Sequence, residues 1–175
     1  MKKYLALLLA LVMSLSLFAC GKKEGDDNKD KDKTKYKVAM ITDYGDITDQ
    51  SFNQTTYEAC KAFAEKNNIE FKYYKPAGDN TADRVAMIES AVEEGFNVIV
   101  MPGYAFGGAI VEAAPQHKDV KFIALDVAKG DLLEAGVAKA GEKYDYNPDN
   151  WELEKYVDMS NVYCAIYKEE LCGYM

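Results

Sequence analysis

The alternation of short apolar runs with helix-like segments from Tyr36 onward constrains this chain most. The predicted strands cover residues 37–42, 69–75, 97–102, 120–126 and 161–167. Strands that alternate with helices indicate right-handed βαβ units in a parallel sheet. Most of the runs are continuously apolar, as expected when helices cover both faces of such a sheet. We therefore predict an α/β fold with a doubly wound parallel sheet.

The segments between the strands have helical periodicity. In the first, Phe52, Ala59, Cys60 and Phe63 lie at offsets of 0, 7, 8 and 11, which places them on one helix face. Ser51 and the residue three positions on, Gln54, have the pattern of a capping box. Further helices are predicted over 81–94 and 107–114, before Gly95 and Pro115, and a last one opens at Glu169.

The first twenty residues have the pattern of an export signal. Lys2 and Lys3 precede sixteen apolar or small residues, a run shorter than the ~20 that span a bilayer as a helix. Leu17-Phe18-Ala19-Cys20 resembles the bacterial lipobox, in which the cysteine is lipidated and becomes the mature N-terminus. We expect residues 1–19 to be a lipoprotein signal peptide. Lipid on Cys20 would then anchor the protein to the extracytoplasmic face of the cell membrane.

The stretch after Cys20 is highly charged, and the rest of the chain is acidic. Residues 21–35 contain eleven charged side chains and no apolar ones, so we expect residues 20–35 to be a disordered linker. Eight of the 21 basic and five of the 29 acidic residues lie in residues 1–35, which leaves residues 36–175 with a net charge of −11. This charge argues against a nucleic-acid partner.

Residues 36–175 are predicted to form one α/β lobe, truncated at its C-terminal end. A helix opens at Glu169 and only about one turn of it precedes Met175, so we expect an N-terminal portion of a longer protein. A stop codon directly after Met175 would contradict this. The connection 127–160 is unusually long. A helix over 131–139 is expected within it. Trp151 is expected to pin the excursion onto the lobe, with contact to a ligand as the alternative role.

Polar residues follow several predicted strands at the edge where open parallel sheets bind ligands. Asp43 follows the first strand, Gly103 and Tyr104 the third, and Asp126 comes at the end of the fourth. The first helix begins at this edge, so its unpaired N–H groups and the side chains of Phe52 and Asn53 are expected to face the crevice. Neither 38–60 nor 96–117 contains Arg or Lys. The crevice therefore suits a neutral or cationic ligand better than a nucleotide.

The sequence does not match the motifs of several common metal, phosphate and catalytic sites. Asp43, Asp46 and Asp49 are spaced by three, unlike the ligands of a calcium loop. No zinc pattern, phosphate-binding glycine loop or nucleophile elbow occurs in the sequence. An aspartate at a strand end also occurs in phosphorylated receiver domains, but those are cytoplasmic. These observations favour a binding protein without metal or cofactor over an enzyme.

The segment from Asp43 to Gln54, DYGDITDQSFNQ, resembles the opening motif of the basic membrane protein family. Residues 122–126 and the stretch from Asn161 to Met175 are also similar to that family, whose members are substrate-binding lipoproteins of ABC importers, many of them purine nucleoside receptors. The resemblance implies a type I periplasmic-binding-protein fold, in which two α/β lobes close on a ligand. This chain would supply the first lobe.

The resemblance also implies roles for particular residues. Phe52 would stack on a nucleobase, and Asn53, Asp43 and Asp126 would bond its polar edges, with Gln54 and Tyr104 at the same rim. The implied partners are a nucleoside, most often a purine nucleoside, and the membrane permease of an ABC importer. Two alternatives stay open, namely a sugar receptor of the same fold and a surface antigen or signalling receptor.

Overall fold

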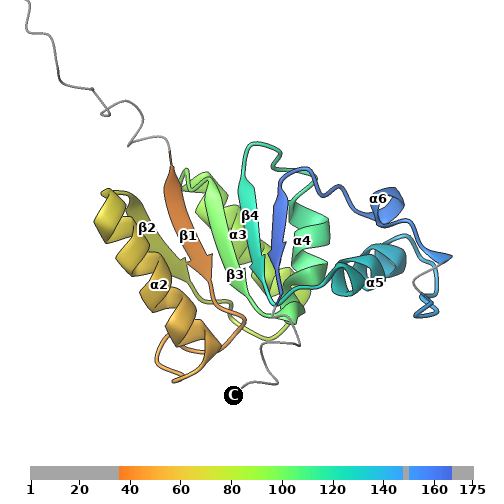
Figure 1. Ribbon diagram of the computed structural model, residues 1–175, viewed down its shortest axis with the longest axis horizontal. Coiled ribbons are helices and arrows are strands. Elements are labelled where there is room, and N and C mark those ends of the chain that lie inside the picture. Colours follow the sequence, from red (N-terminus) through yellow and green to blue (C-terminus); the bar gives the residue numbers. More distant parts are fainter. Residues whose placement is uncertain (1–35, 148–149, 167–175) are drawn as a thin grey trace, which may run out of the picture. The chain divides into compact units, whose positions relative to one another are not determined.

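A computed structural model describes residues 36–147 and 150–166, in which five parallel strands form one sheet (Figure 1). The strands are β1 (Lys37–Ile41), β2 (Glu70–Tyr74), β3 (Val98–Pro102), β4 (Lys121–Leu125) and β5 (Val162–Ala165). All five predicted strands and the α/β fold class are thus confirmed. The predicted signal peptide, the predicted linker and the helix predicted at Glu169 lie outside the described residues.

The strand order β2-β1-β3-β4-β5 sets the place of the crevice. The chain runs outward from β1 to β2, crosses back over β1 to β3, and then continues outward to β4 and β5. In such a sheet the connections after β1 and β3 leave in opposite directions, and a crevice forms at their carboxyl ends. β1 and β3 are adjacent, with Ala39 opposite Ile99 and Met40 opposite Val100.

Three helices cover one face of the sheet. They are α3 (Thr81–Glu93), α4 (Gly107–Ala113) and α5 (Lys129–Lys139), of which α4 packs against both others. The strand residues on this face, such as Ile99, Met101 and Phe122, are fully buried. This layer therefore forms most of the hydrophobic core, and its burial is the main stabilising contribution to the fold.

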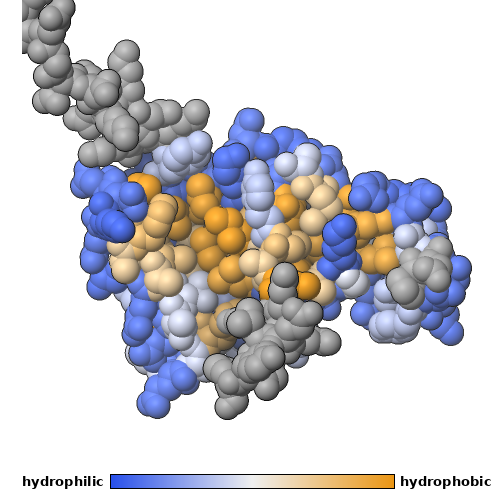
Figure 2. All heavy atoms as spheres, viewed as in Figure 1, coloured by the Kyte–Doolittle hydropathy of each residue, from blue (hydrophilic) through white to orange (hydrophobic). Residues whose placement is uncertain are grey.

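The opposite face carries α2 (Phe52–Asn67), which packs on β1, β2 and β3 (Figure 1). Tyr57 contacts the rings of Phe71 and Tyr73 there, with centroids 5.6 and 5.4 Å away. On β4 and β5 the same face is less well covered by helices. Ile123 is only half-buried there, and Tyr163 is 53% exposed. Figure 2 shows apolar side chains gathered at the centre of this face. The expectation of full cover on both faces is thus met on the α3–α4–α5 face and only in part on this one.

The long connection between β4 and β5 is largely ordered around one helix and an aromatic cluster. The predicted helix over 131–139 is confirmed as α5, and a short helix, α6 (Leu153–Tyr156), follows it. Trp151 lies between Tyr144 and Tyr156, at centroid distances of 5.4 and 5.6 Å, and donates to Asp145. All three rings pack against the hydrophobic core. The expectation that Trp151 pins this excursion is therefore confirmed.

The close contact between α6 and α5 leads to a prediction about stability. A Cβ added at Gly136 would lie 2.9 Å from both Tyr156 Cβ and Val157 Cγ2. We expect Gly136→Ala to lower the free energy of unfolding by about 2 kcal/mol, because overpacking a tight contact costs ~1–3 kcal/mol. Gly130→Ala in the same helix is the matched control, since nothing lies within 4 Å of its added Cβ. Urea denaturation should show a loss only for the Gly136 variant, and equal stabilities would contradict this packing.

Candidate binding crevice

The residues predicted to bind a ligand lie on segments that follow β1, β3 and β4, beside the start of α2. Gly103 makes the turn after β3 with φ of 111°, a conformation that side chains disfavour, and its N–H donates to the Leu125 carbonyl at 2.8 Å. The ends of β3 and β4 are thereby held together. The rim of the crevice is consequently set by backbone geometry before any ligand binds.

Asp43 lies two residues beyond the end of β1, and its carboxylate organises the following loop. Oδ1 accepts hydrogen bonds from the N–H groups of Tyr44 and Gly45 at 2.6 and 2.7 Å, and from Asn53 Nδ2 at 2.8 Å. Partial burial raises the pKa of Asp43, but these hydrogen bonds and the charge of Arg84 outweigh it and hold the pKa below its usual value. Among the described residues no hydrogen bond reaches Oδ2, so this oxygen can accept one from a ligand.

Asn53 connects the strand end to the helix. Its side chain is buried, with 4% of the residue exposed. Oδ1 accepts the N–H of Asp43 at 3.2 Å, and Nδ2 donates to Asp43 at 2.8 Å and to Asp49 at 2.9 Å. The amide oxygen and the amide nitrogen of Asn53 both have partners, and two of these bonds hold Asp43 in place. A ligand that contacts Asn53 would have to share its oxygen or nitrogen with these partners.

Asp49 caps α2, and this corrects two expectations. Ser51 makes no capping hydrogen bond with its side chain, so the predicted capping box is wrong. The Asp49 carboxylate instead accepts the N–H groups of Ser51, Asn53 and Gln54. Those first-turn N–H groups are therefore not free to face a ligand, because a carboxylate from the preceding loop already satisfies them.

Phe52 and Asp126 line one cavity of about 170 Å3 with Leu125, Ala165 and Ile166. Asp126 lies in the left-handed region with φ of 56°, and its N–H donates to the Ala165 carbonyl at 2.7 Å. Aspartate adopts this conformation more readily than most residues do, and Asp126 makes the turn directly after β4. The structure thus brings together an aromatic ring and a carboxylate, as predicted from the sequence.

The two remaining predicted residues lie differently. Gln54 is engaged within the chain, since its carbonyl oxygen accepts the N–H of Gln50 at 3.0 Å and its amide nitrogen donates to Glu58 at 2.8 Å. Tyr104 starts the 3-10 turn η2 (Tyr104–Phe106), is 71% exposed, and lines a separate cavity between α3, α4 and α5. Neither lines the cavity that contains Phe52 and Asp126.

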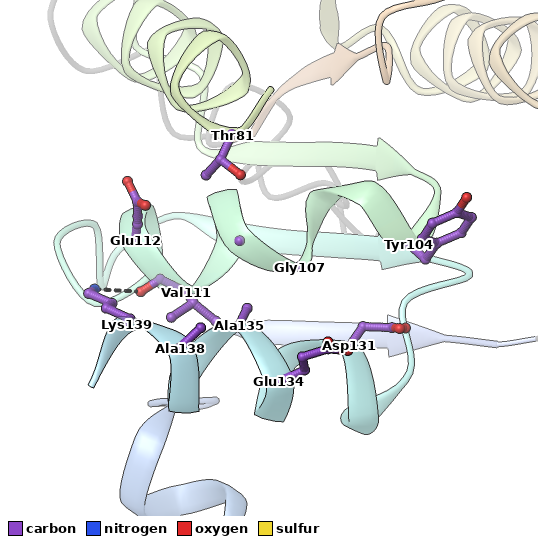
Figure 3. Close-up of a pocket in the computed structure, with 11 residues that line it drawn as sticks. Thr81, Tyr104, Gly107, Val111, Glu112, Asp131, Glu134, Ala135, Ala138 and Lys139 are labelled. Atoms are coloured by element: carbon purple, nitrogen blue, oxygen red, sulfur yellow. Dashed lines mark hydrogen bonds between the residues drawn. The ribbon is translucent and has the colours of Figure 1, made fainter. Parts of the chain in front are cut away.

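That separate cavity has a volume of about 490 Å3 (Figure 3). Glycines of α4 and alanines of α5 form its floor, with Thr81, Glu112, Asp131, Glu134 and Lys139 among the polar residues around it. Several polar groups already have partners. Lys139 donates to the Val111 carbonyl at 3.0 Å, Asp131 accepts the N–H of Ala128, and Glu134 accepts from Tyr146. These three groups are therefore engaged within the chain.

Two residues that organise the crevice were missed in the sequence. Asp49 could have been identified, because an acidic residue just before a helix commonly serves as its cap. Arg84 could not, because it belongs to α3 and reaches Asp43 only through the fold. Lys75 likewise approaches Asp46, at 3.2 Å. The absence of basic residues near the motif in sequence therefore does not make the loop free of positive charge.

The described residues also limit other chemistries. Within 36–147 and 150–166, no group of three or more His, Cys, Asp or Glu side chains is arranged to hold a metal ion. Over the same ranges, no helix is long and apolar enough to cross a membrane.

The chain has an α/β fold of the periplasmic-binding-protein type, with a doubly wound parallel sheet and polar residues at the switch-point edge. More narrowly, the chain belongs to the PnrA-like family of ABC transporter substrate-binding proteins, which matches residues 36–170. The match includes β1 to β5 and the whole crevice motif. The resemblance inferred from the sequence is therefore confirmed.

Individual relatives agree with this assignment. The CD4+ T-cell-stimulating antigen of Listeria innocua serovar 6a is 34% identical over 132 residues, covering 70% of this chain and 36% of the relative. The ABC transporter nucleoside-binding protein BmpA of Lactococcus lactis subsp. cremoris is 25% identical, covering 67% and 34%. The chain thus spans about a third of their length. A crystal structure of a lipoprotein fragment from Peptoclostridium difficile 630 shares the fold, with TM-score 0.50, 18% identity, and coverage of 79% and 91%.

Proposed function

We propose that this protein is an extracytoplasmic substrate-binding lipoprotein that captures nucleosides, purine nucleosides in particular, for an ABC importer. The observation that carries the proposal is the shared cavity of Phe52 and Asp126 at the carboxyl edge of the sheet. A ring supplies a stacking face for a planar base, and a carboxylate accepts from its N–H groups.

Asp43 does not line that cavity, and the proposal takes it as a second polar contact at the same edge of the sheet. Its Oδ1 is committed to the loop and its Oδ2 is open to an N–H or O–H donor, as far as the described residues show. The low pKa of this carboxyl keeps it an acceptor at neutral pH. A phosphorylated ligand is disfavoured because the Asp126 carboxylate that lines the cavity would repel it. An uncharged nucleoside suits such a surface.

The relatives and the chain's own N-terminus support the rest of the proposal. One relative is named as a nucleoside-binding protein of an ABC transporter. A lipid on Cys20 and the charged linker of residues 20–35 would keep the receptor near its permease. Residues that hold the ribose would come from a second lobe, so the first lobe alone should bind weakly.

Calorimetry tests this function. The protein from Gly21 to the end of its reading frame is titrated with adenosine, guanosine, inosine, uridine, free bases, ribose and glucose. Binding of the purine nucleosides, with weaker or absent binding of the others, is the expected result. Binding of sugars alone would favour the sugar-receptor alternative. Absence of binding to every nucleoside would contradict the proposal.

A single substitution tests the stacking contact. We expect Phe52→Ala to weaken nucleoside binding about tenfold, because base–aromatic stacking contributes ~1–3 kcal/mol. Phe63→Ala is the matched control, since it lies on the same helix, is 55% exposed, and lines an apolar cavity on the sheet face instead of the crevice. Calorimetry should show a loss for Phe52 alone. Equal affinities of both variants would remove Phe52 from the site.

A further inference from the structure

Arg84 is a buried cation behind the crevice, and the family motif does not include it. It lies in the first turn of α3, and only 4% of its side chain is exposed. Burying a charge is costly unless the charge is paired and hydrogen-bonded. The partners of this guanidinium therefore indicate what it holds in place.

Those partners come from three different segments at the carboxyl edge of the sheet. Arg84 Nε donates to the backbone carbonyl of Asp43 at 3.1 Å. The guanidinium also forms an ion pair with Asp79, in the connection between β2 and α3. Its Cζ lies 5.6 Å from the ring centroid of Phe106, which belongs to η2 after β3. One side chain thus connects the segments that follow β1, β2 and β3.

The contact with Asp43 also governs the direction of that residue's carboxylate. The Asp43 carbonyl and the Tyr44 N–H belong to one planar peptide unit, so fixing the first orients the second. The Tyr44 N–H donates to Asp43 Oδ1 at 2.6 Å. Arg84 therefore fixes the Asp43 carbonyl directly, and through the Tyr44 N–H it also fixes the Asp43 carboxylate.

We propose that Arg84 is a positioning residue for ligand binding, which fixes the Asp43 carboxylate by holding the peptide that follows it. The proposal rests on the proposed function, because it takes Asp43 as a ligand contact. Lysine is a poor substitute, since its single ammonium lacks the planar fork with which arginine bonds a carbonyl and a carboxylate together.

The environment of Asp43 allows the charge of Arg84 to be separated from its geometry. The polar neighbours of this carboxylate are Asn53 from α2 and the N–H groups of its own loop, and Arg84 is the cation that acts on it. Asp49 is linked to it through Asn53, and Asp79 is paired with the same guanidinium. A charge-retaining and a charge-removing variant should therefore affect its titration differently.

The experiment compares Arg84→Met and Arg84→Lys with the wild-type protein from Gly21 to the end of its reading frame. Two quantities are measured, namely affinity for adenosine, guanosine and inosine by calorimetry, and titration of the Asp43 carboxyl in ligand-free protein by carbon-13 NMR. We expect Arg84→Met to weaken nucleoside binding about tenfold and to raise the pH at which the Asp43 carboxyl titrates. In Arg84→Lys this carboxyl should titrate at a pH closer to that of the wild type, and nucleoside binding should still be weaker than in the wild type.

Each outcome decides the proposal. A folded Arg84→Met protein with unchanged affinity and unchanged Asp43 titration would overturn it, because a merely structural arginine changes stability alone. If Arg84→Met does not fold, Asp79→Asn replaces it, since the Asp79 side chain is 58% exposed. That variant should weaken nucleoside binding by less than is expected for Arg84→Met, because the guanidinium loses the partner that orients it, and an unchanged affinity would overturn the proposal. The Asp43 carboxyl should not titrate at higher pH in this variant, since the substitution removes a negative charge beside Arg84. If the wild type binds no nucleoside, the proposed function fails, while the ligand-free titration still decides what Arg84 does to Asp43.

Discussion

Asn161→Ala is expected to lower the free energy of unfolding by about 3 kcal/mol. Asn161 precedes β5, is 5% exposed, and its Nδ2 lies 2.9–3.1 Å from the carbonyl oxygens of Ala114, His117 and Val120. It thus joins the end of α4, the following loop and the start of β4 to the last strand. Leaving a buried carbonyl unpaired costs ~1–3 kcal/mol, and the alanine variant removes both amide hydrogens at once.

Asn161→Asp sharpens the same prediction. The aspartate is nearly identical in shape but replaces the donor with an oxygen that faces three carbonyl oxygens, so it should destabilise more than alanine does. Asn67→Ala is the control, because Asn67 donates only to the Phe63 carbonyl of its own exposed helix face and should cost about 0.5 kcal/mol. Urea denaturation at pH 7 measures all three. Similar stabilities of the Asn161 and Asn67 variants would contradict this role.

The sheet was predictable because its signals are local. Five apolar runs, separated by helical periodicity, indicate five parallel strands without knowledge of distant contacts. The thin cover over Ile123 and Tyr163 was not predictable in this way. An apolar strand predicts that something packs on each face, but the sequence of the strand does not say which helix lies there.

The crevice was predictable in part for a similar reason. Asp43 and Asp126 were identified because they follow apolar runs, and the carboxyl ends of parallel strands share one edge. The left-handed backbone of Asp126 and the cap formed by Asp49 depend on loop geometry, which residue type suggests only weakly. Arg84 was missed because its contact with Asp43 spans 41 positions of the chain.

The largest combined effect on folding and binding is expected for Asn53→Ala. The substitution removes the donor shared by Asp43 and Asp49 and leaves the N–H of Asp43 without its acceptor. Hydrogen bonds to charged groups contribute ~1.5–3 kcal/mol, so we expect the free energy of unfolding at pH 7 to fall by about 3 kcal/mol. Nucleoside affinity should fall with it, because Asp43 loses the contact that anchors it to α2.

The hydrogen bonds among Asp43, Asn53 and Asp49 should also make the stability of the protein depend on pH. Burial raises the pKa of Asp43 and Asp49, but the hydrogen bonds that they accept outweigh it and lower both. A carboxyl with a lowered pKa in the folded state contributes stability that is present above its unfolded pKa, and this is lost as the pH falls through the folded value. The wild type should therefore lose stability below about pH 4. Asn53→Ala should lose less over that range, since part of the network is already absent. Parallel stability curves of the two proteins from pH 7 to pH 2, measured by urea denaturation, would contradict this role of Asn53.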